Sequence, residues 1–562
     1  MSSIKTRRVL STAAAIAIAG TGLGATLAPA MAQSTTSATT AATAPATTDK
    51  GPLAATFPVN GKSTLTLHKK INPADTKPAN PRGDKETGDT PGKAAGEGYT
   101  FTLKKVADGK QLKDQKVFNA LAGLSQTQSR NISARINADE TLKAAKISAP
   151  AQDSKADFTM KTNAQGVATQ ANIPNGVYLV TETKSPDGVT SQVHPFLVFL
   201  PQPDPSVEPK ATAAANDWNN NVHVYPKNGK TDIDKKVIDA GKNVGDTVDY
   251  TLTATVPSSA QGETLTKFNV RDMFTKTELG EFKLGEATIT HLDGKTEKVT
   301  VTQGNAADLT PVSSLGSDTY IDYTVPTDKL KGGDVVTIKV SAKMLDTRKD
   351  SEIINQARTI VRHSGDNADK ESTPVEVRTY VGDVELTKFN DKDKDGKQGD
   401  GEEVLEGATF EIFRDKAAAD KRAANPDGPT DPAAVGTATT GKDGKAKFTG
   451  LHVTDFENNA DVAEGKLTYY LVEVKAPDGF VLPDAANNVH PITLTREDNT
   501  AEAGKPVMLV NSQSVIPNVP DDRVMPQLPV TGENGIILMG GAAFVLLAGA
   551  GVFAATRNRK ES

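Results

Sequence analysis

The residues from 528 onward form a pattern on which an acyl-transfer enzyme could act. The pentapeptide Leu528-Pro529-Val530-Thr531-Gly532 is followed by an apolar stretch over 535–555 and a basic tail. The apolar stretch is long enough to span a bilayer, and the basic tail favours the inside, so the chain would pause beside a membrane enzyme. Pro529 favours an extended segment that a cleft can bind. A cysteine of that enzyme could attack the Thr531 carbonyl and expel Gly532, leaving a thioester.

A second pattern is rich in carboxylates. Its residues occupy the first, third, fifth, sixth, seventh and twelfth places of a calcium-loop pattern, and they are Asp391, Asp393, Asp395, Gly396, Lys397 and Glu402. No helices are predicted on either side, so an EF-hand is not expected, and the alternative is an acidic turn in solvent. The sequence therefore predicts no required cofactor and a possible calcium site.

Other kinds of chemistry lack the residues that they need. The 7 histidines are scattered, and we find neither a Ser-His-Asp arrangement nor a phosphate-binding loop. The net charge is -6 with both signs interspersed, so binding to nucleic acid is not expected. Arg82-Gly83-Asp84 could engage an integrin-like receptor, but such a tripeptide often arises by chance. We expect a protein that is not an enzyme.

Length, composition and the first residues indicate what must position these groups. A chain of 562 residues is too long for one core, and without cysteine any covalent crosslink must be something other than a disulfide. Residues 1–32 have basic residues, an apolar run and Ala30-Met31-Ala32, which is typical of a secretory signal peptide. Residues 33–54 are rich in Ala, Thr and Ser and are expected to be a disordered linker.

Short alternating segments separated by Gly, Pro, Asn and Asp fill most of the remaining chain. Examples are Ser63–Leu67, Asp249–Ala254 and Val335–Val340, in which apolar and polar residues alternate with the period of a half-buried strand. Many such segments at regular spacing favour tandem β-sandwiches of an all-β, Ig-like class. The apolar spacing over 115–145 instead permits one or two helices.

An internal repeat divides this β-rich part. Tyr178–Gly188 aligns without gaps with Tyr469–Gly479, and each segment is followed by Val-His-Pro. Each unit also begins with a strand that carries a lysine, Leu65–Lys69 in one and Val384–Lys388 in the other. We therefore expect the first and third domains to be copies of one fold. The expected domains are 55–228, 229–381 and 382–519, followed by a C-terminal signal over 520–562.

The end of the first domain resembles the pilin motif of sortase-assembled backbone pilins. Trp218 begins this segment, and Val-His-Val-Tyr-Pro-Lys ends it at Lys227. Tyr469–Gly479 resembles the E-box of the same family, and the pentapeptide resembles its sorting signal. The resemblance implies that Lys227 accepts the thioester formed at Thr531 of another subunit. The alternative is that Lys227 is one of many solvated lysines, but its place at a domain junction favours the acceptor role.

The resemblance also implies Ig-like domains of the CNA-A and CNA-B types, with isopeptide bonds inside them. Such a bond joins a lysine to an asparagine on an adjacent strand, with a buried Glu or Asp assisting. Burial favours the neutral amine and the protonated carboxyl that the reaction needs. In the third domain the matching residues are Lys388, Glu473 and Asn511. In the middle domain they are Lys235, Asp272 and Asn355. The alternative is exposed lysines on edge strands.

The first domain leaves its crosslink less certain. The repeat indicates Lys69 and Glu182, and Asn228 would be the third residue. Lys70 lies next to Lys69, and a shift of one residue along a strand would turn the side chain to the other face. Some relatives also lack an asparagine at this point and lack the bond.

These observations together predict the shaft subunit of a covalent pilus, secreted and attached to the cell wall. The expected partners are pilus-specific and housekeeping sortases, other copies of the chain, minor pilins and peptidoglycan, with a host receptor that the sequence does not identify. The alternative is a wall-anchored adhesin or a minor tip or basal pilin. Lys227 separates the two, because only a shaft subunit needs an acceptor lysine.

Overall fold

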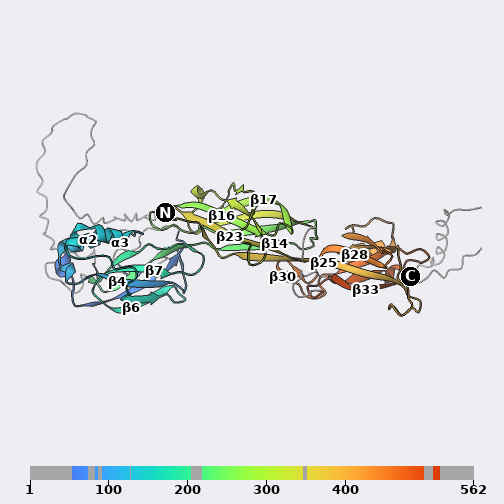
Figure 1. The fold of residues 1–562 in the computed structure, drawn as a ribbon, viewed down its shortest axis with the longest axis horizontal. Helices are drawn as coiled ribbons and strands as arrows, with labels where there is room; N and C mark the ends of the chain where they lie inside the picture. Colours follow the sequence, from blue (N-terminus) through green and yellow to red (C-terminus); the bar gives the residue numbers. More distant parts are fainter. Residues whose placement is uncertain are drawn as a thin grey trace, which may run out of the picture. The chain divides into compact units, whose positions relative to one another are not determined.

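The computed structural model describes residues 53–73, 83–86, 92–126, 128–203, 218–345, 351–498 and 510–518, with the main chain alone over 510–515. Strands predominate in these residues (Figure 1). The three strand segments named above as examples all lie within strands of the structure, so these predictions are confirmed.

In its described residues, the N-terminal region combines four sheets with a group of helices. Its elements are α1 (Leu53–Thr56), β1 (Lys62–His68), β2 (Lys70–Ile71), β3 (Lys93–Ala94), β4 (Thr100–Asp108), η1 (Gln111–Lys113), α2 (Gln115–Ser125), α3 (Ile132–Ala138), α4 (Glu140–Ala144), β5 (Phe158–Lys161), β6 (Val167–Pro174), β7 (Gly176–Lys184), β8 (Val189–Ser191), β9 (Phe196–Leu200), β10 (Gln202–Pro203), β11 (Trp218–Asn219), β12 (Asn221–Val224) and β13 (Lys227–Lys230). The segment 115–145 is helical as the spacing permits, but it forms three helices, α2, α3 and α4, rather than one or two. Asp114 caps α2 by accepting from the Lys116 and Val117 amides.

Strand β7 is buried on both faces because it separates two cores. Tyr178 and Val180 face the sheet β12-β1-β6, whereas Val177 and Leu179 pack with the helices. Successive side chains of a strand point to opposite faces, so one strand contributes to both cores. This position makes β7 a rigid support for Glu182, which lies near its end.

The middle region is a sandwich of two sheets around one core. Its elements are β14 (Ile233–Ile238), β15 (Thr247–Thr255), β16 (Leu265–Phe274), β17 (Leu279–Thr290), β18 (Thr296–Lys298), β19 (Thr302–Gln303), β20 (Ala307–Asp308), β21 (Thr319–Thr324), η2 (Thr327–Lys329), β22 (Val335–Met344), β23 (Glu352–His363), β24 (Lys370–Glu371) and β25 (Val375–Asn390). One sheet has the order β14-β15-β22-β17-β18, and the other contains β19-β21-β16-β23-β25. Inward-facing apolar residues of both sheets form a single cluster.

Strand β25 belongs to the middle region at its start and to the third region at its end. Residues 375–380 pair with β23, and residues from 381 onward pair with β28 and β33. The expected boundary between residues 381 and 382 therefore falls inside a continuous strand. The further elements are β26 (Thr409–Phe413), α5 (Lys416–Ala424), β27 (Gly436–Thr439), β28 (Lys445–His452), β29 (Phe456–Glu457), β30 (Ala460–Asp461), β31 (Tyr469–Lys475), η3 (Ala485–Asn487), β32 (Val489–Ile492) and β33 (Val510–Asn518).

The first and third regions share an arrangement of strands, as the repeat predicts. In the first, β1 has a parallel neighbour β12 and an antiparallel neighbour β6. In the third, β25 has a parallel neighbour β33 and an antiparallel neighbour β28. The repeated segments form β7 and β31, which are the inner strands of β4-β7-β9 and β26-β31-β32. The two units therefore use one topology to bring a lysine strand, a glutamate strand and a closing strand together.

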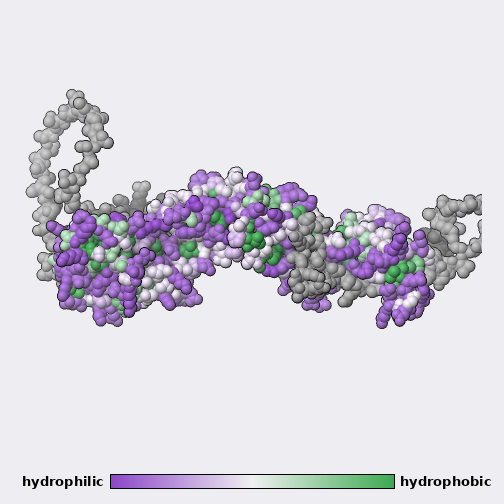
Figure 2. All heavy atoms as spheres, in the orientation of Figure 1, coloured by the Kyte–Doolittle hydropathy of each residue, from purple (hydrophilic) through white to green (hydrophobic). Residues whose placement is uncertain are grey.

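The visible surface is mainly hydrophilic, with small separate apolar spots (Figure 2). Among the described residues, the large exposed hydrophobic side chains are Ile238, Leu292, Val312, Leu315, Val404 and Val435. Scattered side chains of this kind are normal on a soluble surface. The candidate reactive groups are therefore the buried polar side chains.

Candidate functional site: buried lysine triads and the acceptor strand

The first region contains a closed triad of buried side chains. Lys69 Nζ donates to Glu182 Oε2 at 2.6 Å and to Asn228 Oδ1 at 2.5 Å. Asn228 Nδ2 donates to Glu182 Oε1 at 2.6 Å. The side chains of Lys69 and Glu182 are both 0% exposed, and Asn228 is 1% exposed. The structure therefore brings together all three residues expected for this domain, which lie just after β1, in β7 and in β13.

The same triad decides between the two adjacent lysines. Lys69 is buried against the rings of Tyr99 and Phe101, whereas Lys70 is half-buried and pairs with Lys227 in the parallel β2–β13 ladder. Burial lowers the pKa of Lys69 to about 8, although the nearby Glu182 opposes this shift. A lysine with a lowered pKa more readily becomes the neutral amine that can act as a nucleophile.

The middle region holds a second buried pair at its sheet interface. Lys235 Nζ of β14 donates to Asp272 Oδ1 of β16 at 2.7 Å, and both side chains are 0% exposed. Burial lowers the pKa of Lys235 and raises that of Asp272. Lys235 Nζ also lies 3.4 Å from the main-chain oxygen of Gln356, next to Asn355. Asn355 is 1% exposed, and its amide atoms have no partner that meets hydrogen-bond geometry among the described residues. The lysine, acid and asparagine predicted here lie close together.

In the third region the lysine and the acid meet as expected. Lys388 Nζ donates to Glu473 Oε2 at 2.8 Å, and both side chains are 0% exposed. Burial lowers the pKa of Lys388 and raises that of Glu473. Lys388 Nζ also donates to the main-chain oxygen of Pro517 at 2.8 Å. The amine therefore points toward the end of β33.

The prediction that Asn511 is the third residue of this triad was wrong. In the parallel β25–β33 register, Asn511 lies opposite Val384, whereas Lys388 lies opposite Ile516. Four residues of a strand separate these positions by roughly 13 Å, too far for a bond to Lys388. Asn518 follows Pro517, is 2% exposed, and its amide nitrogen has no partner among the described residues. Asn518 is the asparagine that the structure places beside the lysine.

The first region supports this correction through its own register. Lys70 lies opposite Lys227, and Ile71 lies opposite Asn228, so Asn228 is two positions past the level of Lys69. Asn518 lies opposite Asn390, which is two positions past Lys388. A signal was present in the sequence, because an asparagine lies just after the proline of each closing strand, in Pro226-Lys227-Asn228 and in Pro517-Asn518.

The predicted acceptor lysine lies on the strand that closes the first triad. Lys227 begins β13 and is half-buried, and its neighbour Asn228 faces the interior. The preceding residues are held firmly, because Trp218 packs against Phe57 with ring centroids 5.1 Å apart. Tyr225 stacks on His68, with ring centroids 4.7 Å apart. These two ring contacts anchor the segment that leads into β13.

Two histidines join β12, which precedes β13, to the lysine strand β1. His68 Nε2 and His223 Nδ1 share a hydrogen bond of 2.9 Å, so one of the two nitrogens carries the proton. Burial is the main reason that the pKa of His68 is lowered to about 4, with further lowering by His223, Lys85 and Lys70. Burial also lowers the pKa of His223. Both rings are therefore expected to be neutral near pH 7.

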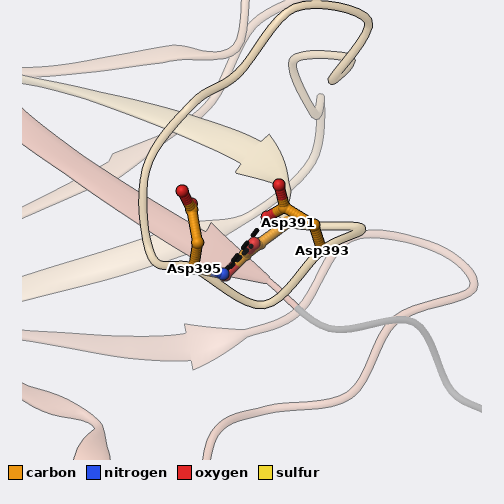
Figure 3. A group of neighbouring side chains, drawn as sticks. All are labelled: Asp391, Asp393 and Asp395. Carbon is orange, nitrogen blue, oxygen red and sulfur yellow. Dashed lines mark hydrogen bonds between the residues drawn. The ribbon is translucent and has the colours of Figure 1, made fainter.

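The acidic loop brings three of its expected ligands together. Single carboxylate oxygens of Asp391, Asp393 and Asp395 lie within 4.8 Å of one another (Figure 3). The amides of Asp395 and Gly396 donate to Asp391, and Gly396 has a φ of +76°, which favours glycine. These oxygen donors fit calcium in chemical type.

The other two expected ligands are not part of this acidic group. Glu402 accepts from the main-chain amides of Lys392 and Gly399 instead. The Lys397 amide donates to Asp395 Oδ1 at 2.7 Å, which helps to close the turn.

Several predictions fall on residues outside the described part of the chain. They are the signal peptide over 1–32, Arg82, and the C-terminal signal with Leu528–Gly532 and its apolar stretch. Within the described ranges, the helices are too short and too polar to cross a membrane.

Comparison with protein-family models assigns three parts of the chain. Residues 60–229 match the Gram-positive pilin subunit D1, N-terminal domain. Residues 384–504 match a prealbumin-like fold domain, and residues 523–562 match the LPXTG cell wall anchor motif. The first match includes the Lys69 triad and Lys227. The last includes the pentapeptide, so the chain is a sortase substrate.

Known proteins resemble the chain over most of its length. It is 28% identical to fimbrial subunit type 2 of Actinomyces naeslundii over 532 residues, which cover 89% of this chain and 90% of that protein. It is 27% identical to fimbrial subunit type 1 of Actinomyces viscosus over 436 residues, covering 71% and 76%. The solved structure of the full-length major pilin SpaD from Corynebacterium diphtheriae has 27% identity and a TM-score of 0.55, covering 82% of this chain and 98% of that one. The chain is a Gram-positive pilin, a shaft subunit of a sortase-assembled pilus that is anchored to the cell wall.

Proposed function

We propose that subunits are joined by transfer of the Thr531 acyl group to the Nζ atom of Lys227 in another copy of the chain. The sortase cysteine attacks the Thr531 carbonyl, the bond to Gly532 breaks, and a thioester forms. The neutral amine of Lys227 then attacks the thioester, an amide forms, and the cysteine leaves as a thiol. The observation that carries this proposal is the placement of Lys227 at the start of β13, half-buried and next to the buried Asn228.

The three buried triads are proposed to become isopeptide bonds. In the first region, Lys69 passes one proton to Glu182, and its neutral Nζ attacks Cγ of Asn228. A second proton moves from Nζ through the carboxyl group to Nδ2, the Cγ–Nδ2 bond breaks, and ammonia leaves. The hydrogen bond from Asn228 Nδ2 to Glu182 Oε1, at 2.6 Å, offers the path for that proton. Lys235 with Asn355, and Lys388 with Asn518, would react in the same way with Asp272 and Glu473.

These roles are structural and are performed once for each bond, so no enzymatic turnover is proposed. A pilus-specific sortase would make the chain of subunits, and a housekeeping sortase would transfer the last one to peptidoglycan. Minor pilins would complete the fibre and supply any contact with a host receptor. Calcium is proposed for the loop of Asp391, Asp393 and Asp395, where it would tie the loop to the end of β25.

The intersubunit bond can be tested by replacing one lysine of β13. In cells that make the wild-type pilus, Lys227→Ala should abolish the SDS-resistant ladder in wall extracts while the monomer is still secreted. Lys227→Arg should fail as well, because a guanidinium remains protonated. Lys230→Ala is the matched control, since Lys230 lies at the other end of the same strand and pairs with Asp232. A normal ladder in the Lys227 variants would contradict the proposal.

A further inference from the structure

Ser185 donates a hydrogen bond to the carboxylate of the first triad. The third triad has no equivalent hydroxyl contact among the described residues. Ser185 Oγ donates to Glu182 Oε1 at 2.5 Å, and it accepts from Gln192 Nε2 at 2.7 Å. The hydrogen bond from Gln192 occupies the acceptor side of the hydroxyl and leaves its proton directed at the carboxylate. Glu182 therefore receives three donors, since Lys69 and Asn228 donate to it as well.

The equivalent carboxyl groups of the other two regions accept fewer hydrogen bonds from the described residues. The internal repeat aligns Ser185 with Ala476, which has no hydroxyl. Glu473 Oε1 is buried and has no hydrogen-bond partner among the described residues. Asp272 Oδ2 in the middle region is likewise buried with no partner of good hydrogen-bond geometry in the described part of the chain, although the nearby Asn355 amide opposes the rise that burial causes in the pKa of Asp272. Each of these two acids thus has a lysine on one oxygen and no such donor on the other.

The position that precedes Val-His-Pro differs in the same way between the repeats. In the first region Gln192 binds the Ser185 hydroxyl. In the third region Asn488 occupies the aligned place, and its side chain binds the main-chain amide and carbonyl of Glu473. The first region thus uses this place to act on the carboxylate, and the third uses it to hold the strand.

The Ser185 hydroxyl affects the protonation state of the Lys69–Glu182 pair, from which the isopeptide bond would form. The ion pair of Lys69 and Glu182 and the neutral pair hold the same number of protons, but only the neutral pair has a nucleophilic amine and an acid that can supply a proton. A hydroxyl that donates to a carboxylate stabilises the ionised form. It also occupies Oε1, the oxygen that must pass a proton to Asn228 Nδ2. Both effects make the reactive pair rarer.

We propose that Ser185, oriented by Gln192, is a positioning residue that keeps Glu182 ionised and so delays the Lys69–Asn228 crosslink relative to the Lys388–Asn518 crosslink. This inference rests on the proposed isopeptide function. A delay would leave β13 without its covalent tie while Lys227 is still to be joined to another subunit. The crosslink would then form in a strand whose acceptor lysine has already reacted.

The experiment uses the full chain secreted by cells that lack the polymerising sortase. A pulse of isotope-labelled amino acids is followed by a chase, and mass spectrometry of the digested protein measures each crosslinked peptide over time. The Lys388–Asn518 peptide serves as an internal clock for the Lys69–Asn228 peptide. In the wild type the first-region crosslink should lag behind the clock. Ser185→Ala should shorten that lag about tenfold or more, the size expected for losing a hydrogen bond to a charged group.

Three variants separate this role from simple packing. Ser185→Thr keeps the hydroxyl and should keep the lag, and Gln192→Ala should shorten it in part. Ala476→Ser places a hydroxyl at the aligned position and should slow the third-region crosslink. If Ser185→Ala leaves the rate of the Lys69–Asn228 crosslink unchanged or slows it, while the Lys388–Asn518 crosslink forms at its normal rate, the role of Ser185 is overturned. The proposed crosslinks would still stand. A wild type with no lag would overturn the role of Ser185 too. Absence of all crosslinks would instead overturn the proposed function.

Discussion

Lys227 and Asn228 are consecutive residues of β13, but Asn228 is 1% exposed and hydrogen-bonded to Lys69, whereas Lys227 is half-buried. Alternation along a strand separates the two side chains, so one strand can serve the chemistry between subunits and the chemistry within a subunit. The two functions should therefore be separable by mutation.

We expect Asn228→Ala to form pili that are weaker in their first domain. The variant keeps Lys227, so the SDS-resistant ladder should persist, but the Lys69–Asn228 crosslink cannot form. Trypsin should then cut the first domain of purified variant fibres much faster than that of wild-type fibres. Loss of the ladder in Asn228→Ala would mean that the two roles of β13 are not independent.

The corrected asparagine of the third domain leads to a direct comparison. Intact mass of the secreted wild-type chain should show the loss of one ammonia for each crosslink formed. Asn518→Ala should retain one more ammonia than the wild type, because Lys388 then has no amide to attack. Asn511→Ala is the matched control and should leave the mass loss unchanged, since Asn511 lies opposite Val384. The reverse result would restore Asn511 and show that the β25–β33 register differs in solution.

In the middle domain we expect Asn355→Ala to lower the free energy of unfolding by about 5 kcal/mol, as for a disulfide that closes a loop of roughly 120 residues. This variant keeps the buried Lys235–Asp272 pair, so the loss reports mainly on the crosslink. Asp272→Asn should also block the bond, but it should cost more because a buried lysine loses its charged partner. Calorimetry with peptide mapping would measure both. An uncrosslinked Lys235 peptide in the wild type would rule out this bond.

The His68–His223 pair predicts that β12, just before the acceptor lysine, loosens in acid. The pKa of His68 is about 4 in the docked state and 6.5 when unperturbed. The undocked strand therefore binds more protons between these values, so docking is most stable above pH 6.5 and weakens as the pH falls toward 4. Hydrogen exchange of peptides covering 218–226, corrected for intrinsic rates, should show protection falling over this range.

His68→Phe tests whether this pair causes the effect. The variant keeps an aromatic ring beside Tyr225 and leaves His223 as the one titrating ring of the pair, so its protection should fall less than that of the wild type between pH 7 and pH 4.5. Burial lowers the pKa of His490 in the third domain to about 4 as well. The comparison is therefore confined to the peptides covering 218–226. Equal loss of protection in wild type and variant would assign the effect to other groups.

Calcium should raise the melting temperature of the full chain, and a chelator should reverse the effect, because a ligand that binds the folded state stabilises it. Asp393→Asn should remove this response. Asp400→Asn removes the same charge from the same loop outside the carboxylate cluster, so it should retain the response. Identical melting curves with calcium and with chelator in the wild type would exclude the site.

The sequence by itself determined the organisation of this protein and much of its chemistry. The alternation of apolar and polar residues predicted domains built from β-strands. The gapless match of Tyr178–Gly188 to Tyr469–Gly479 predicted that two of these domains share a topology. The lysine and acid of the first and third triads lie at repeated positions, Lys69 with Lys388 and Glu182 with Glu473. The pairing of lysine with acid, and the whole of the middle triad, came from the resemblance to sortase-assembled pilins. The helices over 115–145 were visible in their apolar spacing.

Only the tertiary structure decided which groups meet. Asn518 rather than Asn511, and Lys69 rather than Lys70, follow from the register between strands that are far apart in the sequence. A shift of one residue turns a side chain to the other face, and local sequence does not encode that register. Glu402 matched the calcium pattern, yet its carboxylate binds main-chain amides of its own loop. The contact of Ser185 with Glu182 depends on a turn that folds back on its strand, so a motif alone could not reveal it.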